Sequence, residues 1–535
     1  MVKTITYQGV NMKKLISVSV AAAVAASVSF ASSTDDLRAE LEALKKEVAA
    51  LKKQTKGLKA KKLKKQISEL KSAALNDNIK WNVDFRTAYD VIGYKYSDGS
   101  SDWNQIMTNR LWLGMGYAPT SNITFKGLLS YYKQYGQSTS QAMNAFNYFD
   151  WVVNETPNPS GELRVKEAYW LYFGDDFFGV DIPWTASIGR RPATDGLLVN
   201  FRDDQNAKSP IGHIINTEFD GASFKFDLSN VTNVSGMYFK ICLGRGMTNA
   251  NIRYAGIQPN ITQSTGLFGG SGQFLITNMT GSEYTKVDGY ESTDLFGFIF
   301  VPYDDGQYSV HTTAFKALNL PGMKINDMAD TNGDGIPDAY LADFKQVGDL
   351  YGAAISFLAQ GIGDGISDML DDTNFFVSLA ASKTDPDGNN QMLGMTMMTP
   401  TGPMVLGAAP GESKTGTSWY TGINWPCQLI DDARVGVEYN HGSQYWRSFT
   451  YAEDTLAGSK LAARGDAYEI WFNKELIGKI LTAQVRYTYI DYKYTGSNGF
   501  FADGGTPLTI DQAEAMGMTT VDKAQDIRFY LRYRY

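Results

Sequence analysis

Arginine and lysine residues recur at every second position in several short segments of this 535-residue chain. In the closing segment QDIRFYLRYRY, Arg528, Arg532 and Arg534 alternate with apolar and aromatic residues. Successive side chains of a β-strand point to opposite faces, so this spacing places the cations on one face. A guanidinium group is a rigid fork that fits carboxylate, sulfate or phosphate. The same alternation assigns to the polar faces of strands the side chains of Arg86, Arg110, Arg164, Lys166, Arg434, Arg486, Arg528, Arg532 and Arg534.

Two interpretations of these cations are open. Rings of Arg and Lys favour anions in a pore, so we expect the set to line a lumen and to give a mild anion preference. In the alternative interpretation the cations pair with Asp84, Glu162 and Glu438 and only line a wet wall. Carboxylates in the loops oppose the preference, because negative charge at a pore mouth repels anions.

The dipeptide Arg190-Arg191 interrupts the alternation, because two adjacent side chains cannot both face one side of a regular strand. Pro192 follows and cannot donate to a strand ladder, so a strand ends here. We expect Arg190 and Arg191 to line a loop that folds into the lumen as a constriction. An ordinary polar loop is the alternative.

The segment DTNGDGIPD predicts a calcium loop. Its oxygen-bearing residues occupy positions 1, 3, 5 and 9 of such a loop, and Gly335 at position 6 allows the sharp turn. The ligands expected for Ca²⁺ are Asp330, Asn332, Asp334 and Asp338. The start of the segment resembles thrombospondin-type repeats, but Leu341 stands at position 12 in place of an acidic ligand. A turn rich in Asn, Asp and Gly is the alternative, and no other cofactor is expected.

Enzyme chemistry is not expected from this sequence. It contains three histidines and no GxSxG, HExxH or P-loop motif. The two cysteines, Cys242 and Cys427, form no CxxC or CxxCH motif, so a zinc ribbon or a c-type haem is unsupported. Whether these cysteines pair with each other depends on geometry, which the sequence leaves open.

Alternating strands are the elements that position the cations. From Lys80 onward the chain repeats segments such as WNVDFRTAYDV, MTNRLWLGMGY and LTAQVRYTYIDY, whose apolar and polar residues alternate. Short turns between strands alternate with long loops rich in Gly, Asn, Asp, Ser and Thr, which is typical of outer-membrane barrels. We therefore predict an all-β transmembrane β-barrel of about 14–18 antiparallel strands over residues 80–535. A soluble propeller or sandwich is the alternative, but the sequence has no blade repeat.

The N-terminus indicates export from the cytoplasm. Met12 begins MKKLISVSVAAAVAASVSFASS, in which two lysines precede an apolar stretch and a small-x-small cleavage site at Ser29-Phe30-Ala31. This pattern predicts a signal peptide over residues 1–31, with Met12 as the true start.

Residues 35–75 are expected to form an α-helical coiled coil. Apolar residues repeat with heptad spacing from Leu37 to Leu58, which favours a coiled coil over a single amphipathic helix. Residues 1–75 hold 15 Lys and Arg against 6 Asp and Glu, a charge of +9, while the remainder holds 34 against 51, a charge of −17. The basic segment therefore predicts a separate anionic partner, and we expect peptidoglycan.

Two longer stretches resemble a family of uncharacterised porin-like outer-membrane proteins. They are IGRRPATDGLLVNFRDD (188–204) and GHIINTEFDGASFKF (212–226). The signal peptide, the helical segment and the aromatic closing strand resemble trimeric porins with an N-terminal periplasmic coiled coil. The resemblance implies a homotrimer in the bacterial outer membrane, with the stalk in the periplasm. Many porins end in Phe, whereas this chain ends in Tyr535.

The function expected from these features is passive diffusion of small hydrophilic solutes through an outer-membrane pore. The expected partners are outer-membrane lipid, further copies of the chain, peptidoglycan and small solutes, and no nucleic acid. One rival is a structural tether with a closed barrel. Another is a barrel scaffold for an electron-transfer partner.

Overall fold

The computed structural model describes residues 79–136, 162–191, 196–249, 291–329, 339–363, 365–399, 402–450, 455–497 and 505–535, without the side chains of 323–329, 339–345 and 398. The chain divides into two compact units, residues 1–74 and 75–535. The predicted signal peptide and coiled coil lie outside the described residues and stay predictions.

The described part of the second unit forms a closed antiparallel barrel of sixteen strands, which confirms the predicted barrel and lies within the expected strand number. Neighbouring strands of the barrel follow each other along the chain, and β20 pairs with β1 to close it. The strands are β1 (Lys80–Tyr96), β2 (Ser101–Thr120), β3 (Ile123–Gln134), β4 (Arg164–Gly174), β5 (Trp184–Arg191), β8 (Phe219–Asp227), β9 (Tyr238–Met247), β10 (Thr293–Asp304), β11 (Tyr308–Ala329), β12 (Ala339–Gln360), β13 (Asn374–Pro386), β16 (Thr415–Pro426), β17 (Ala433–Gly442), β18 (Gly465–Ile477), β19 (Leu481–Tyr492) and β20 (Val521–Arg534).

Smaller elements lie in the connections between barrel strands. β6 (Gly196–Leu197) and β7 (Lys208–Ile211) form a parallel pair, and β14 (Gly394–Thr399) and β15 (Gly402–Gly407) form a hairpin. The helices are η2 (Val199–Phe201), α4 (Ser229–Thr232), α5 (Asp368–Asp371) and α6 (Ile510–Ala515). Among the described residues, no helix has the length and apolar character needed to cross a membrane.

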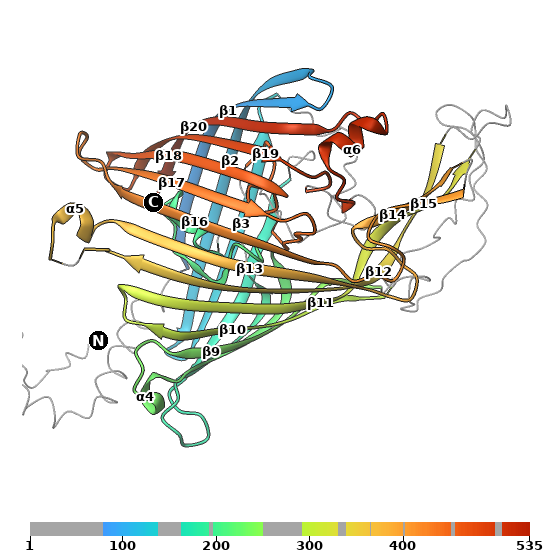
Figure 1. Ribbon diagram of the computed structural model, residues 1–535. Helices are drawn as coiled ribbons and strands as arrows, with labels where there is room; N and C mark the ends of the chain where they lie inside the picture. The colour runs from blue at the N-terminus through green and yellow to red at the C-terminus, as the bar shows by residue number, and fades with distance from the viewer. Residues whose placement is uncertain are drawn as a thin grey trace, which may run out of the picture. The chain divides into compact units, whose positions relative to one another are not determined.

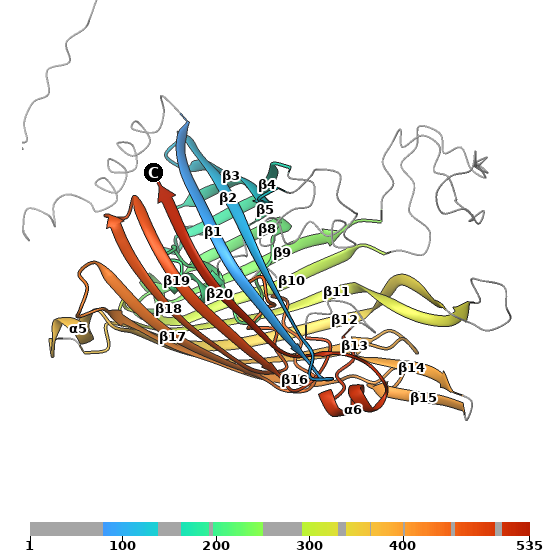
Figure 2. The same cartoon turned by 90° about the horizontal axis from the view of Figure 1, so that it is seen from above.

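The two ends of the barrel differ. At the end where β1 begins and β20 stops, which we call the terminal end, Val83 and Tyr535 exchange backbone hydrogen bonds of 2.8 and 2.9 Å. Short connections such as 121–122, 305–307 and 478–480 lie at this end, together with α4 and α5. The longer connections lie at the opposite, loop end, together with α6, β14 and β15 (Figures 1 and 2). Short turns at one end and long loops at the other match the pattern predicted from the sequence.

The alternation of β20 separates an apolar exterior from a charged interior. Ile527, Phe529 and Leu531 are 41–44% exposed, whereas Arg528 and Arg532 are at most 3% exposed. A strand of a closed barrel has one outward and one inward face, so the exposed set faces outward and the buried arginines face inward. The apolar exterior is the surface that a lipid bilayer would cover.

A cation on the outward face should therefore destabilise the folded barrel in lipid. We expect Ile527→Arg to lower the free energy of unfolding by about 2–4 kcal/mol, because a charge is placed against hydrocarbon. Urea titration of the barrel in phospholipid vesicles measures this, with Ile527→Val as the matched control. Equal urea midpoints for the two variants would contradict the assignment of this face to lipid.

Candidate functional site: the filled barrel interior

The connection between β5 and β8 folds into the barrel. Within this first inward segment (residues 196–218), Leu197, Leu198, Val199, Ile211 and Ile214 are at most 6% exposed. They belong to one buried cluster with residues of β11, β12, β13 and β16. Residues 196–218 thus lie inside the barrel, whereas Arg190 and Arg191 belong to β5 and not to a loop. The constriction expected at this place stays a prediction.

The backbone near the end of β5 approaches the neighbouring strand β4 closely. Gly189 has a φ of +134°, and a Cβ at this position would lie 2.2 Å from the carbonyl oxygen of Ala168, so only glycine fits. Beyond Gly189 the two arginines diverge. The Nη1 atom of Arg190 lies 3.7 Å from the exposed carboxylate of Asp220. The guanidinium of Arg191 lies 4.1 Å from the ring centre of Tyr169.

The connection between β17 and β18 also turns inward, which sequence reasoning missed. In this second inward segment (residues 443–464, described for 443–450 and 455–464), the backbone N–H of Phe449 donates to Ile214 at 2.8 Å, and the carbonyl of Phe449 accepts from the backbone N–H of Asn216 at 2.9 Å. The indole of Trp446 is 1% exposed and donates to the carbonyl of Leu461 at 2.8 Å. One feature of the sequence could have revealed this segment: it is a long connection that carries tryptophan, lysine and arginine in place of small polar residues.

The two inward segments cover an apolar half of the inner wall. Phe315, Leu350, Leu358, Phe376 and Ala380, from β11, β12 and β13, are buried under them in the main hydrophobic cluster. Since nonpolar contacts are not directional, this half holds the segments in place without fixing their exact position.

A buried histidine marks the edge of the apolar half. His213 accepts or donates hydrogen bonds with the hydroxyls of Ser378 at 2.9 Å and Ser418 at 2.8 Å. Burial lowers the pKa of His213 to about 3, so its ring is neutral near pH 7. Neutral imidazole suits its place on the first inward segment, among serine hydroxyls and aromatic rings.

The other half of the interior is held by ion pairs that meet at Glu469 of β18. Its carboxylate accepts from Arg202 of the first inward segment at 3.2 Å and from Lys460 of the second. The wall contributes Thr488, which donates at 2.7 Å, and Arg486, whose Nε lies 3.8 Å away. One buried carboxylate thus joins both inward segments to the barrel wall.

Further ion pairs neutralise three of the predicted pore cations. Lys166 pairs with Glu218, Arg528 with Asp90, and Arg532 with Asp84. Lys460 also pairs with Glu438, which in addition accepts from the hydroxyl of Tyr420 and from the indole of Trp471 at 2.9 Å. Pairing with Asp84 and Glu438 was the alternative interpretation of the cation set, although Glu438 takes its partner from the second inward segment.

The predicted cations separate into two groups. Those buried on the inner face, at most 3% exposed, are Arg86, Arg110, Lys166, Arg486, Arg528 and Arg532. Those at the ends of strands are Arg164, Arg190, Arg191, Arg434 and Arg534. The calcium-loop residues Asp330, Asn332, Asp334 and Asp338 lie outside the described residues, so Ca²⁺ binding stays a prediction.

A cavity of about 940 Å³ lies at the terminal end. Its lining mixes cations with carboxylates, and its charged residues are Asp203, Asp204, Arg434, Asp431, Asp432, Lys474, Glu475, Lys479 and Arg534. Arg534 pairs with Asp204 at 2.9 Å. Cys427 also lines this cavity, and its thiol and that of Cys242 are both free.

Removing the charge of Glu469 should loosen both inward segments. We expect Glu469→Gln to lower the free energy of unfolding by about 3–5 kcal/mol, because buried cations lose their carboxylate. Urea unfolding measures the change, and limited proteolysis reports whether residues 196–218 and 443–464 become accessible first.

The matched control is an ion pair on the outside of the barrel. Arg245 and Asp294 lie 2.7 Å apart with 54% and 41% of their side chains exposed, so Asp294→Asn should cost at most about 1 kcal/mol. Equal losses of stability in Asp294→Asn and Glu469→Gln would contradict the central role of Glu469.

Comparisons with known proteins give one family and several distant folds. OmpF of Salmonella typhi, in its complex with daunomycin, has a TM-score of 0.42 at 11% identity, over 86% of this chain and 99% of that chain. OprB of Pseudomonas putida has a TM-score of 0.42 at 11% identity, over 87% of this chain and 96% of that chain. The channel DcaP of Acinetobacter baumannii has a TM-score of 0.39 at 11% identity, over 86% of this chain and 97% of that chain. Such distant likenesses carry no argument about function, and a search of curated proteins finds no match. A family model described as "Protein of unknown function (DUF3373)" matches residues 100–535, so the chain belongs to this family.

Proposed function

We propose that the protein is an outer-membrane channel through which small hydrophilic solutes diffuse passively. The observation that carries the proposal is the separation of faces around a closed barrel, which is apolar outside and carries buried charged residues along one half of its inside. A barrel that buries its apolar face in a core needs no such exterior, whereas a membrane barrel with a wet interior does. The proposal contains no catalysed reaction.

The two inward segments restrict the solutes to small ones. Both segments enter the interior from the loop end and meet at the backbone hydrogen bonds between Phe449 and residues 214–216. A solute entering the 940 Å³ cavity at the terminal end must then pass between packed segments and wall. Inorganic ions and solutes of similar size fit this arrangement better than sugars or peptides do.

A mild anion preference is part of the proposal, but it rests on fewer cations than the sequence suggested. Lys166, Arg528 and Arg532 are paired with carboxylates, so their charges are largely compensated. The carboxylates of the terminal cavity oppose anion entry. The preference therefore depends on interior cations that have no carboxylate within ion-pair distance.

Single-channel recording in a planar bilayer tests the channel. We expect discrete steps of low conductance, because the inward segments narrow the path, and a reversal potential in a KCl gradient that indicates preferred passage of chloride. Conductance steps with a potassium-selective reversal potential would contradict the anion preference, but they would still support the channel.

A closed barrel that acts as a tether is the second candidate, because the interior is filled from two sides. No conductance from a barrel shown to be folded and inserted would favour it over the channel. No contact among the described residues supports the third candidate, a scaffold for an electron-transfer partner.

The stalk remains a proposal on residues 35–75. We propose that it forms a trimeric periplasmic coiled coil whose lysines contact peptidoglycan, because the positive charge of the chain is concentrated there. Deleting residues 35–75 should release the barrel from peptidoglycan pull-downs and reduce cross-linked trimers. Unchanged pull-down of the deleted form would contradict the contact.

A further inference from the structure

Three interior cations on neighbouring strands β5, β8 and β9 differ from the paired set, because none has a carboxylate within ion-pair distance among the described residues. Arg191 is 7% exposed, and its Nη1 atom is buried without a hydrogen-bond partner. Lys240 is partly buried and donates to the hydroxyl of Ser209 at 2.6 Å. Lys225 lies 3.9 Å from the ring centre of Tyr238.

The register of β8 and β9 places two of these cations directly against each other. Lys225 and Lys240 are cross-strand partners on the inner face. Like charges directly opposite in an antiparallel pair are destabilising. Asp227 and Asp304 act on Lys225 only from beyond ion-pair distance. A buried charge needs a compensating charge or hydrogen bonds, so the three cations leave a local excess of positive charge.

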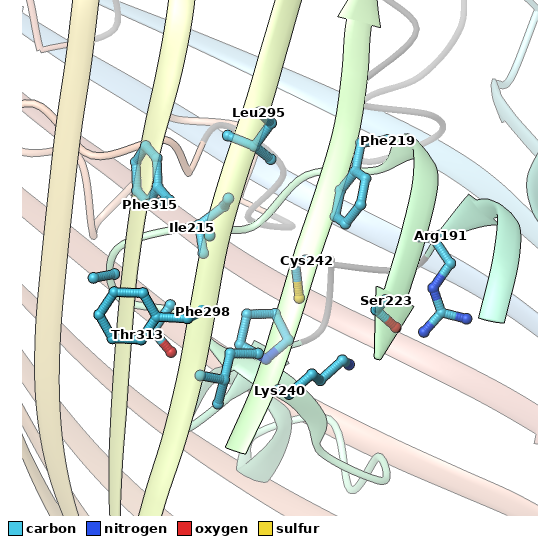
Figure 3. A pocket seen from close by; sticks show the side chains of 14 residues that line it. Arg191, Ile215, Phe219, Ser223, Lys240, Cys242, Leu295, Phe298, Thr313 and Phe315 are labelled. Carbon is cyan, nitrogen blue, oxygen red and sulfur yellow. The ribbon is translucent and has the colours of Figure 1, made fainter. Parts of the chain in front are cut away.

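A cavity of about 40 Å³ lies beside this excess charge. Figure 3 shows Arg191, Ser223 and Lys240 on one side of it, the apolar side chains of Leu295 and Phe315 on the other, and Cys242 between the two groups. One water needs roughly 10–15 Å³ by the same measure, so the cavity accepts a small ion and excludes organic solutes. The hydroxyl of Ser223, which shares a 3.0 Å hydrogen bond with Ser187, can turn to donate into the cavity.

We propose that this cavity is a binding site for a small monovalent inorganic anion such as chloride, held by Arg191 and Lys240 with the hydroxyl of Ser223. The anion supplies the negative charge that the facing cations lack. This inference deepens the proposed anion preference, because it places one binding step at a defined part of the wall. Water alone in the cavity is the competing account.

Cys242 provides a reporter inside the site. In Cys427→Ser it is the only thiol left, so its modification by a negatively charged and a positively charged methanethiosulfonate reagent can be followed in detergent micelles. Chloride is compared with gluconate, which is too large for the cavity, at equal ionic strength. Both reagents are larger than the cavity and reach Cys242 only when it opens, so chloride bound in the closed site should slow both by a factor of 1 + [Cl⁻]/Kd, about tenfold at about nine times Kd.

Variants distinguish chloride bound at this cavity from an effect of chloride on the charge of the whole protein. Lys240→Met and Arg191→Met, each in Cys427→Ser, should remove this protection of Cys242 by chloride. Arg245→Met removes a cation from the outside of the barrel, and there the protection should persist. Rates that chloride leaves unchanged, or changes equally in all variants, would overturn the site in favour of water.

The urea midpoint of unfolding is a second readout, which does not depend on how fast the reagents reach Cys242. A ligand that binds only the folded state stabilises it, so chloride should raise the urea midpoint above the gluconate value. Lys240→Met should lose this response and, with like-charge repulsion removed, should be more stable than the parent in gluconate. Equal chloride responses in parent and variant would overturn the proposal. Neither readout needs conductance, so a silent barrel that still responds to chloride would refute the channel and keep the site.

Discussion

The carboxylate of Glu469 is the point at which the barrel wall and both inward segments meet. Arg202 arrives from the first segment, Lys460 from the second, and Arg486 and Thr488 from the next strand of the wall. Lys460 continues the network to Glu438, which lies on β17. Bringing such groups out of water costs several kcal/mol per ion, so the network is a poor source of net stability. Its effect is positional, because charged hydrogen bonds require particular atoms at particular distances.

This positional effect complements the apolar half of the interior. The first inward segment places Leu197, Leu198 and Val199 against the apolar wall, and Arg202 lies three residues later against the charged one. Backbone contacts then fix the charged end, since the carbonyl of Arg202 accepts from Gln484 at 2.6 Å and from Asn473 at 2.8 Å. Apolar burial thus supplies the attraction that draws the segment inward, and the polar contacts select one position for it.

The sequence predicted what depends on local alternation. In β20 the period of two identifies Arg528 and Arg532 as inward-facing and Ile527 and Phe529 as outward-facing, and the structure agrees. Ion pairing could not be predicted in the same way, because its partners are remote: Arg532 and Asp84 are 448 residues apart, and Arg202 and Glu469 are 267 apart. The second inward segment was missed for a related reason. Residues 443–464 have no regular period, and their role appears only when the first inward segment lies beside them.

In the proposed channel, the attraction of an ion to the interior depends on which cations are paired and not only on the number of arginines. A cation beside its carboxylate presents a dipole, whose field weakens faster with distance than that of a lone charge. Arg528 and Arg532, which dominate the sequence pattern, therefore act weakly on a passing ion because Asp90 and Asp84 lie beside them. Lys225 and Lys240, which no alternating arginine pattern singles out, face each other across the ladder instead of facing a carboxylate. The register of two short strands thus places like charges opposite each other, whereas the closing strand pairs its arginines with carboxylates.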